Sequence, residues 1–172
     1  RINTHSDWMK DDLCMLANVP VDGIVLPKLA LGMWDTFKTL ADSLGFSKDV
    51  IGIVETPAAF FELASLAAID DIKGLILGGE DLVSSLGAQR TLSGNELSYP
   101  RSMLKMACAK SGILAIDTPW TNLDPAHLEK DIIHGVTLGF DAKCAIHPNQ
   151  VPLINEAFAP SRKAIHFARR AM

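Results

Sequence analysis

Two acidic residues stand where they could share a metal ion. Glu55 directly follows one apolar run of the sequence, and Asp81 follows another after two glycines and a glutamate. Carboxylates that converge in one cavity repel each other, and a hard divalent cation relieves that repulsion. Mg²⁺ prefers oxygen ligands and takes one or two protein carboxylates together with water and substrate oxygens. The pair therefore predicts a Mg²⁺ site, provided that the fold brings these two strand ends together.

Other interpretations of the same residues are weaker but stay open. A charged residue after a strand can be a solvated loop residue or a helix cap, and Asp is a common cap. Zinc would require nitrogen or sulfur ligands at short spacing. The histidines show no H-E-x-x-H motif or similar spacing; they are His5, His127, His134, His147 and His166.

The elements that must position these residues are short apolar runs. Continuous apolar runs, without alternation, are typical of parallel strands that are buried on both faces. Six segments fit this pattern: Arg1 to Asn3, Gly23 to Pro27, Ile51 to Glu55, Gly74 to Gly78, Ile113 to Asp117 and Lys143 to His147.

Helical patterns lie between the predicted strands, at 38–44, 58–68, 102–110 and 128–138. Pro57 is well placed to open one helix, and glycines at 45, 112 and 139 are placed to end three others. This alternation predicts a single α/β domain over residues 1–172, either a closed barrel or an open doubly wound sheet. No G-x-G-x-x-G motif follows any strand, which argues against dinucleotide binding.

Each predicted strand ends in a polar or ionisable residue. In a parallel barrel the carboxyl ends of all strands meet on one face, and that face holds the active site. The residues at these ends are Arg1 to Asn3, Lys28, Glu55, Asp81, Asp117 and His147.

Composition restricts the class of partner. The net charge of −4 offers no basic field for nucleic acid and no polybasic stripe for a membrane surface. No apolar stretch approaches the roughly 20 residues that a membrane span needs. The three cysteines form no C-x-x-C pair, and their odd number argues against a disulfide framework. We therefore expect a small-molecule ligand and a reducing, cytoplasmic compartment.

The motifs resemble those of a known family when they are taken in order. After Arg1-Ile2-Asn3 these are Gly23-Ile24-Val25-Leu26-Pro27-Lys28, Ile53-Val54-Glu55-Thr56-Pro57, Gly78-Gly79-Glu80-Asp81-Leu82, Ala115-Ile116-Asp117-Thr118 and Ala145-Ile146-His147-Pro148-Asn149-Gln150. Six motifs in register over nearly the whole chain resemble the citrate lyase β-subunit family of the HpcH/HpaI aldolase and citrate lyase superfamily.

The resemblance implies a (β/α)8 TIM barrel, commonly a homotrimer, with Mg²⁺ held by Glu55 and Asp81. Arg1 matches a family arginine that grips the substrate, so Arg1, Glu55 and Asp81 are the expected catalytic residues. Lys28 is a second expected substrate-binding residue beside Arg1. Asp117 and His147 match motif positions without an assigned chemistry. Glu80 is expected to point away from the site, by strand alternation.

The chain also departs from the family pattern. Members of the family carry two further strands before the motif that matches Arg1, and a C-terminal lid that supplies a catalytic Asp to the neighbouring subunit. We therefore expect about six βα units, from the third strand onward, in a fragment that lacks the first two strands and the lid. Six strands do not close a barrel in the usual geometry.

The expected function is that of a carbon–carbon lyase. The resemblance implies Mg²⁺-dependent retro-aldol or Claisen-type chemistry on a CoA-thioester hydroxy acid such as citryl-, citramalyl- or malyl-CoA. Two alternatives stay open at this point. One is a metal-dependent aldolase that acts on free 2-oxo acids, and the other is a non-catalytic, degenerate subunit.

Overall fold

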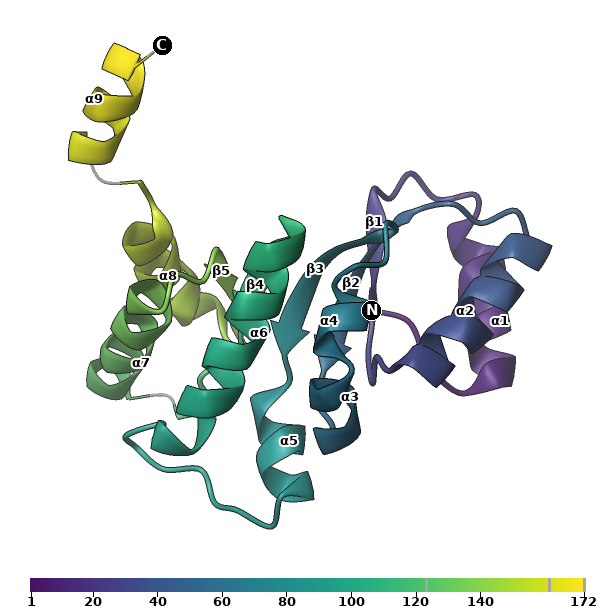
Figure 1. Cartoon of the computed structure of the whole chain (residues 1–172), viewed down its shortest axis with the longest axis horizontal. Helices are drawn as coiled ribbons and strands as arrows, with labels where there is room; N and C mark the ends of the chain where they lie inside the picture. The colour runs from purple at the N-terminus through teal and green to yellow at the C-terminus, as the bar shows by residue number, and fades with distance from the viewer. Residues whose placement is uncertain (123, 161, 172) are drawn as a thin grey trace.

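The structure, a computed structural model, describes residues 1–122, 124–160 and 162–171. Within these residues strands and helices alternate along the chain (Figure 1). The strands are β1 (Gly23–Leu26), β2 (Asp49–Val54), β3 (Ile72–Leu77), β4 (Leu114–Asp117) and β5 (Ala142–Lys143). The helices are α1 (Ser6–Leu16), α2 (Leu31–Ser43), α3 (Pro57–Phe61), α4 (Leu63–Leu66), α5 (Gly79–Ser85), α6 (Ser98–Ser111), α7 (Pro125–Thr137), α8 (Val151–Phe158) and α9 (Arg162–Ala171). Short 3-10 helices lie at η1 (Asn95–Leu97) and η2 (Pro148–Gln150).

The strands form one parallel sheet in the order β1-β2-β3-β4-β5, so each strand pairs with the next one in the sequence. A doubly wound sheet reverses its strand order at a switch point, whereas a TIM barrel adds its strands in sequence. The sequential order confirms an α/β fold with a parallel sheet and favours the barrel-like alternative over the doubly wound one.

The predicted first strand is wrong. Arg1 to Asn3 forms no strand, although the Ile2 N–H donates to the Val25 carbonyl oxygen at 3.1 Å beside β1. Asn3 does not pair with β1, because its backbone N–H and its side-chain amide both donate to the Asp12 carboxylate instead, at 2.7 and 2.9 Å. The described chain therefore has five strands rather than six.

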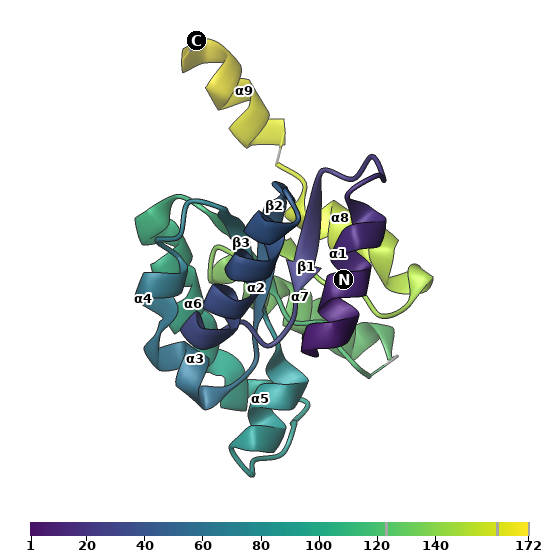
Figure 2. The ribbon, with the colours of Figure 1, turned by 90° about the vertical axis from the view of Figure 1, so that its right-hand side faces the viewer.

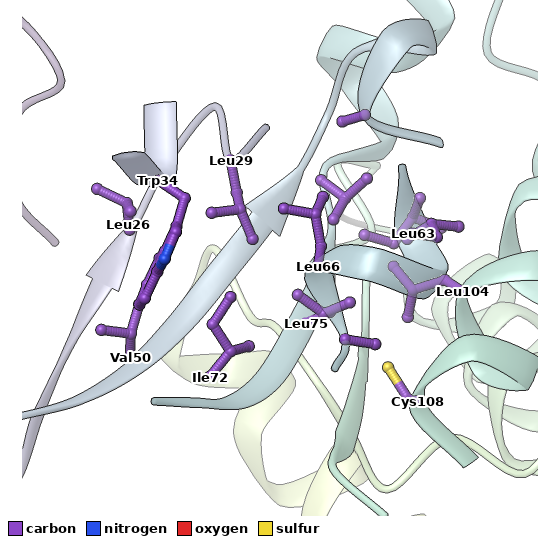
Figure 3. Packing of buried hydrophobic residues seen from close by; sticks show 14 of the residues in the cluster. Leu26, Leu29, Trp34, Val50, Leu63, Leu66, Ile72, Leu75, Leu104 and Cys108 are labelled. Atoms are coloured by element: carbon purple, nitrogen blue, oxygen red, sulfur yellow. The ribbon is translucent and has the colours of Figure 1, made fainter. Parts of the chain in front are cut away.

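The two faces of the sheet differ in burial. Parallel crossovers are right-handed, so sequential strands place their helices on one face. On that face lies the main hydrophobic core, which Figure 3 shows between strand residues such as Val50 and Leu75 and helix residues such as Leu66 and Leu104. Most side chains on the other face are only partly buried; they are Val25, Ile51, Ile76 and Ile116, with Leu114 more exposed, whereas Ile53 beside the strand ends is buried. The expected burial on both faces therefore holds for one face only.

Helix boundaries follow the expected start and stop residues. Pro57 opens α3, and the Thr56 hydroxyl before it accepts the Ala59 N–H at 3.3 Å. Gly45, Gly112 and Gly139 end helices with φ of 64°, 68° and 84°, a left-handed conformation that glycine adopts without a steric penalty. These stops confirm that α2, α6 and α7 each end just before the turn that leads to the next strand.

A second, smaller hydrophobic cluster lies beside the main core. It consists of Trp120, Leu128, Ile132 and Ile154 and joins α7 to α8. Helix α9 extends away from the rest of the chain in both overall views (Figures 1 and 2). Among the described residues no helix has the length and apolar character needed to cross a membrane.

Candidate functional site

The carboxyl ends of β2, β3 and β4 surround a pocket of about 300 Å³. Its charged lining residues are Arg1, Glu55, Glu80 and Asp81. The expected catalytic residues Arg1, Glu55 and Asp81 are therefore brought together at one opening, although they are far apart in the sequence. Thr118, which follows β4, also lines the pocket.

Glu55 is held in place by the main chain around it. Its side chain is buried, and its Oε1 accepts the backbone N–H of Lys28 at 2.8 Å. The chain after β3 passes so close that a Cβ on Gly78 would lie 2.3 Å from the Glu55 Cβ. Glycine at position 78 is therefore required for the chain to pass Glu55 this closely.

Asp81 lies close enough to Glu55 to influence its ionisation. Burial is the largest influence on Glu55 and raises its pKa, and a hydrogen bond to Asp81 and the charge of Asp81 raise that pKa further. The Lys28 N–H and the charge of Arg1 act in the opposite direction, but the pKa of Glu55 stays above its usual value. Two carboxyl groups that share a site, one of them with a raised pKa, form an arrangement that a cation stabilises.

The donor set at this pocket fits magnesium better than zinc. Within residues 1–122, 124–160 and 162–171, no group of three or more His, Cys, Asp and Glu side chains is arranged to hold a metal. Zinc sites need such a group of nitrogen, sulfur or oxygen ligands. Mg²⁺ keeps several waters and takes only one or two carboxylates from the protein, which Glu55 and Asp81 offer.

Lys28 contacts the site through its backbone N–H. It has a φ of 51°, which is uncommon for a residue with a side chain. This conformation points its N–H at Glu55, while the residue is exposed and is not among those that line the pocket. A substrate-binding role for the Lys28 side chain stays a prediction.

The sequence predicts that Glu80 points away from the site, but in the structure Glu80 lines the pocket. It lies in the first turn of α5 rather than on a strand, lines the edge of the pocket, and accepts the Arg90 Nε–H at 2.8 Å. Arg90 also donates to Glu96, and its guanidinium lies 5.4 Å from the ring centroid of the buried Trp120. Arg90 therefore neutralises Glu80 and fixes the loop before α6 at the rim of the pocket.

A buried ion cluster lies behind the pocket and was not foreseen as a unit. It consists of Arg101 from α6, Asp117 from β4, Asp131 from α7 and Lys143 from β5. Their side chains are 0–4% exposed, and both cations contact both carboxylates at 2.6–2.8 Å. The cluster is balanced in charge, which buried ions require.

The remaining strand-end residues have structural roles. Asp117 belongs to the ion cluster, and a Cβ on Gly135 would lie 3.0 Å from its Oδ2, so glycine lets α7 approach closely. The His147 Nδ1 accepts the Asn149 N–H at 3.2 Å and caps η2. The buried Gln150 accepts from Ile146 N–H and donates to the Trp120 carbonyl oxygen, which ties two loops together.

A sequentially wound parallel α/β sheet with a carboxylate-lined pocket at its strand ends defines a TIM-barrel-like class of protein with a candidate metal site. The sequence profile of the HpcH/HpaI aldolase/citrate lyase family matches residues 1–148. The chain belongs to this family, which confirms the resemblance seen in its motifs.

Similar proteins include a citrate lyase subunit beta-like protein from Deinococcus radiodurans, 32% identical over 166 residues, which cover 94% of this chain. A (3S)-malyl-CoA thioesterase from Cereibacter sphaeroides is 27% identical over 99% of this chain. The chain spans only 57% and 59% of the length of these two relatives.

A solved structure of similar fold is CitE from Mycobacterium tuberculosis in complex with magnesium, acetoacetate and coenzyme A. It matches 94% of this chain and 60% of its own chain, with a TM-score of 0.75 and 30% sequence identity.

Proposed function

We propose that this chain carries the core of a Mg²⁺-dependent carbon–carbon lyase that acts on a CoA-thioester hydroxy acid such as citryl-, citramalyl- or malyl-CoA. The observation that carries the proposal is the convergence of Arg1, Glu55 and Asp81 on one pocket. The magnesium and coenzyme A of the similar M. tuberculosis structure support this choice of cofactor and substrate class. The full (β/α)8 barrel, the homotrimer and the cytoplasmic location stay predictions.

In this proposal Glu55 and Asp81 would hold the metal, which would supply a Lewis acid to the substrate oxygens. Arg1 binds a substrate carboxylate, because a guanidinium matches a carboxylate with two parallel hydrogen bonds. A general base takes the hydroxyl proton as the carbon–carbon bond breaks, so the hydroxyl becomes a carbonyl and the electron pair of the broken bond passes to the thioester enolate. A proton returned to the enolate carbon then gives the acyl-CoA product. The positive charge of Arg1 at the pocket stabilises the oxygen charge that develops.

The experiment measures Mg²⁺-dependent cleavage of malyl-CoA and citramalyl-CoA by the full chain and by Glu55→Gln and Asp81→Asn variants. We expect either variant to lose more than about 100-fold in kcat/KM, because each removes a direct metal ligand. Glu156→Gln is the matched control, since Glu156 is exposed on α8 and lies outside the pocket. Wild-type activity in Glu55→Gln would exclude the proposed mechanism.

A second candidate, thioester hydrolysis, is favoured by the similarity to the malyl-CoA thioesterase. The two reactions differ in their sulfur product, because hydrolysis releases free CoA thiol whereas carbon–carbon cleavage leaves the thioester intact. A thiol reagent therefore separates them in the same assay. A metal-dependent aldolase on free 2-oxo acids would turn over those acids without any CoA thioester.

A further inference from the structure

Thr118 joins the candidate site to the buried ion cluster. It is fully buried, and its carbonyl oxygen accepts the Lys143 Nζ–H at 2.6 Å. Its hydroxyl oxygen accepts the backbone N–H of Gly79 at 3.1 Å. Thr118 thus contacts a charged group of the cluster on one side and the first residue of α5 on the other.

The cluster gives Thr118 a fixed support. Besides Thr118, Lys143 Nζ donates to Asp117 at 2.8 Å and to Asp131 at 2.6 Å, which uses its three N–H donors. Arg101 donates to the same two carboxylates. Because every cation is bonded to both anions in a buried environment, a shift of Lys143 would break charge-assisted hydrogen bonds.

The contact between Thr118 and Gly79 leaves no free space. A Cβ on Gly79 would lie 2.8 Å from the Thr118 Oγ1 and 2.8 Å from the Leu97 Cδ1. Asp81 follows two residues later in the same first turn of α5. The position of its carboxylate relative to Glu55 therefore depends on where Thr118 holds the start of this helix.

We propose that Thr118 is a positioning residue for Asp81, with Lys143 and the ion cluster as its support. The inference rests on the proposed function, since the carboxylate pair is its target. Loss of the Thr118 hydroxyl would leave the Gly79 N–H without its acceptor and release the first turn of α5. Groups that orient metal ligands influence metal affinity even when they do not contact the metal.

The test compares Thr118→Val, which keeps the shape but removes the hydroxyl, with Thr118→Ser, which keeps the hydroxyl. The probe is Mn²⁺, which suits the same oxygen ligands as Mg²⁺, and free Mn²⁺ is measured by electron paramagnetic resonance. We expect Thr118→Val to weaken Mn²⁺ binding by about 10- to 100-fold and Thr118→Ser to keep it within about 3-fold. All measurements are made well below each variant's unfolding midpoint.

Two further variants separate positioning from stability. Leu104→Ala removes a buried side chain in the main core, so it lowers the unfolding midpoint without changing Mn²⁺ affinity. The charge-balanced double variant Lys143→Met with Asp131→Asn removes the support of the Thr118 carbonyl and should weaken Mn²⁺ binding in the same direction as Thr118→Val. Thr118→Ala serves if Thr118→Val does not fold.

The outcomes distinguish this inference from the proposed function. Parent-like Mn²⁺ affinity in Thr118→Val, together with loss of binding in Glu55→Gln, would overturn the role of Thr118 alone. Equal losses in Thr118→Ser and Thr118→Val would also overturn it, because the hydroxyl would not be the cause. Absence of Mn²⁺ binding by the parent chain would overturn both.

Discussion

At the scale of single residues, a candidate site residue was predictable where it directly follows an apolar strand or belongs to a motif. Glu55 and Asp81 follow apolar runs, and Arg1 was matched by motif, so all three were named from the sequence. The ion cluster could not be found in this way, because its four members come from four elements and no local spacing joins them. Lys28 was named for its side chain, but the structure shows a backbone hydrogen bond.

The conformation of Lys28 gives a test of that backbone role. With φ at 51°, any residue with a Cβ is strained, so Lys28→Gly should be more stable than Lys28→Ala by about 1 kcal/mol. Both variants keep the N–H that bonds Glu55, and both should keep metal affinity. Urea unfolding and Mn²⁺ binding measure the two effects. A large rise in substrate KM in both variants would instead show that the Lys28 side chain binds substrate.

The ion cluster makes stability depend on pH. Burial alone would raise the pKa of Asp131, but the charges and hydrogen bonds of Lys143 and Arg101 outweigh it and lower that pKa below 3.8. A carboxyl with a lowered folded-state pKa stabilises the fold above its unfolded pKa, and this contribution is lost as pH falls through the folded value. Stability that depends on Asp131 is therefore complete at neutral pH, begins to fall near the usual Asp pKa of about 4, and is lost as pH falls through the lowered folded-state pKa.

Asp131→Asn tests this dependence. The substitution leaves the two buried cations with one carboxylate, so we expect a loss of about 3–5 kcal/mol in unfolding free energy at pH 7. The difference between the variant and the parent should shrink as the pH falls toward 3, in urea unfolding series at fixed ionic strength. A constant difference across that range would show that the charge of Asp131 is not the cause.

At the scale of elements, periodicity located strands β1 to β5 and the helical segments around α2, α3–α4, α6 and α7, but it did not predict α1, α5, α8 or α9, nor the boundaries that depend on single side-chain contacts. The helix predicted over 58–68 is divided at Glu62 into α3 and α4, and the Glu62 carboxylate there accepts the Leu31 N–H at 2.8 Å. The strand predicted to run from Lys143 to His147 is only two residues long, because Gln150 takes the Ile146 N–H. The contact of Glu62 with Leu31 joins residues 31 positions apart, whereas that of Gln150 with Ile146 is local, and neither contact leaves a trace in the hydrophobic periodicity.

The turn from β3 to α5 tolerates only glycine where it passes Glu55. A Cβ on Gly78 would collide with the Glu55 Cβ, which is close to the backbone and cannot move aside. We therefore expect Gly78→Ala to lower stability by about 1–3 kcal/mol and to abolish metal binding. Gly32→Ala is the control: its Cβ meets nothing within 4 Å, so α2 should gain up to about 1 kcal/mol. Thermal unfolding and Mn²⁺ titration of both variants measure the contrast.

At the scale of the whole molecule, strand–helix alternation predicted the class of fold and the sequential order of strands distinguished its two forms. The difference in burial between the two faces of the sheet could not be predicted. The type of an apolar residue does not show whether other elements pack against the face on which it lies. Val25, Ile51 and Ile76 illustrate this: they are as apolar as the core residues and yet remain partly exposed.

The separate position of α9 predicts a small contribution to stability. It extends away from the rest of the chain, so a chain that ends at Pro160 should lose less than about 1 kcal/mol in unfolding free energy. Ile154→Ala, which truncates a buried residue of the smaller cluster, should cost about 2–5 kcal/mol. Urea unfolding compares the two. A loss of similar size on removing α9 would contradict the arrangement seen here.

The two-residue β5 has a consequence for motion on slow timescales. Within the described residues the ion pairs of Asp131, the smaller hydrophobic cluster and a short strand attach α7 and α8 to the sheet, so we expect this segment to open as one cooperative unit without global unfolding. Its amide protons should then exchange with deuterated solvent sooner than those of β2 and β3. Each such opening would separate Lys143 from Asp117 and remove the hydrogen bond that supports Thr118. The lifetime of the closed state therefore limits how long Glu55 and Asp81 keep the relative position that metal binding needs.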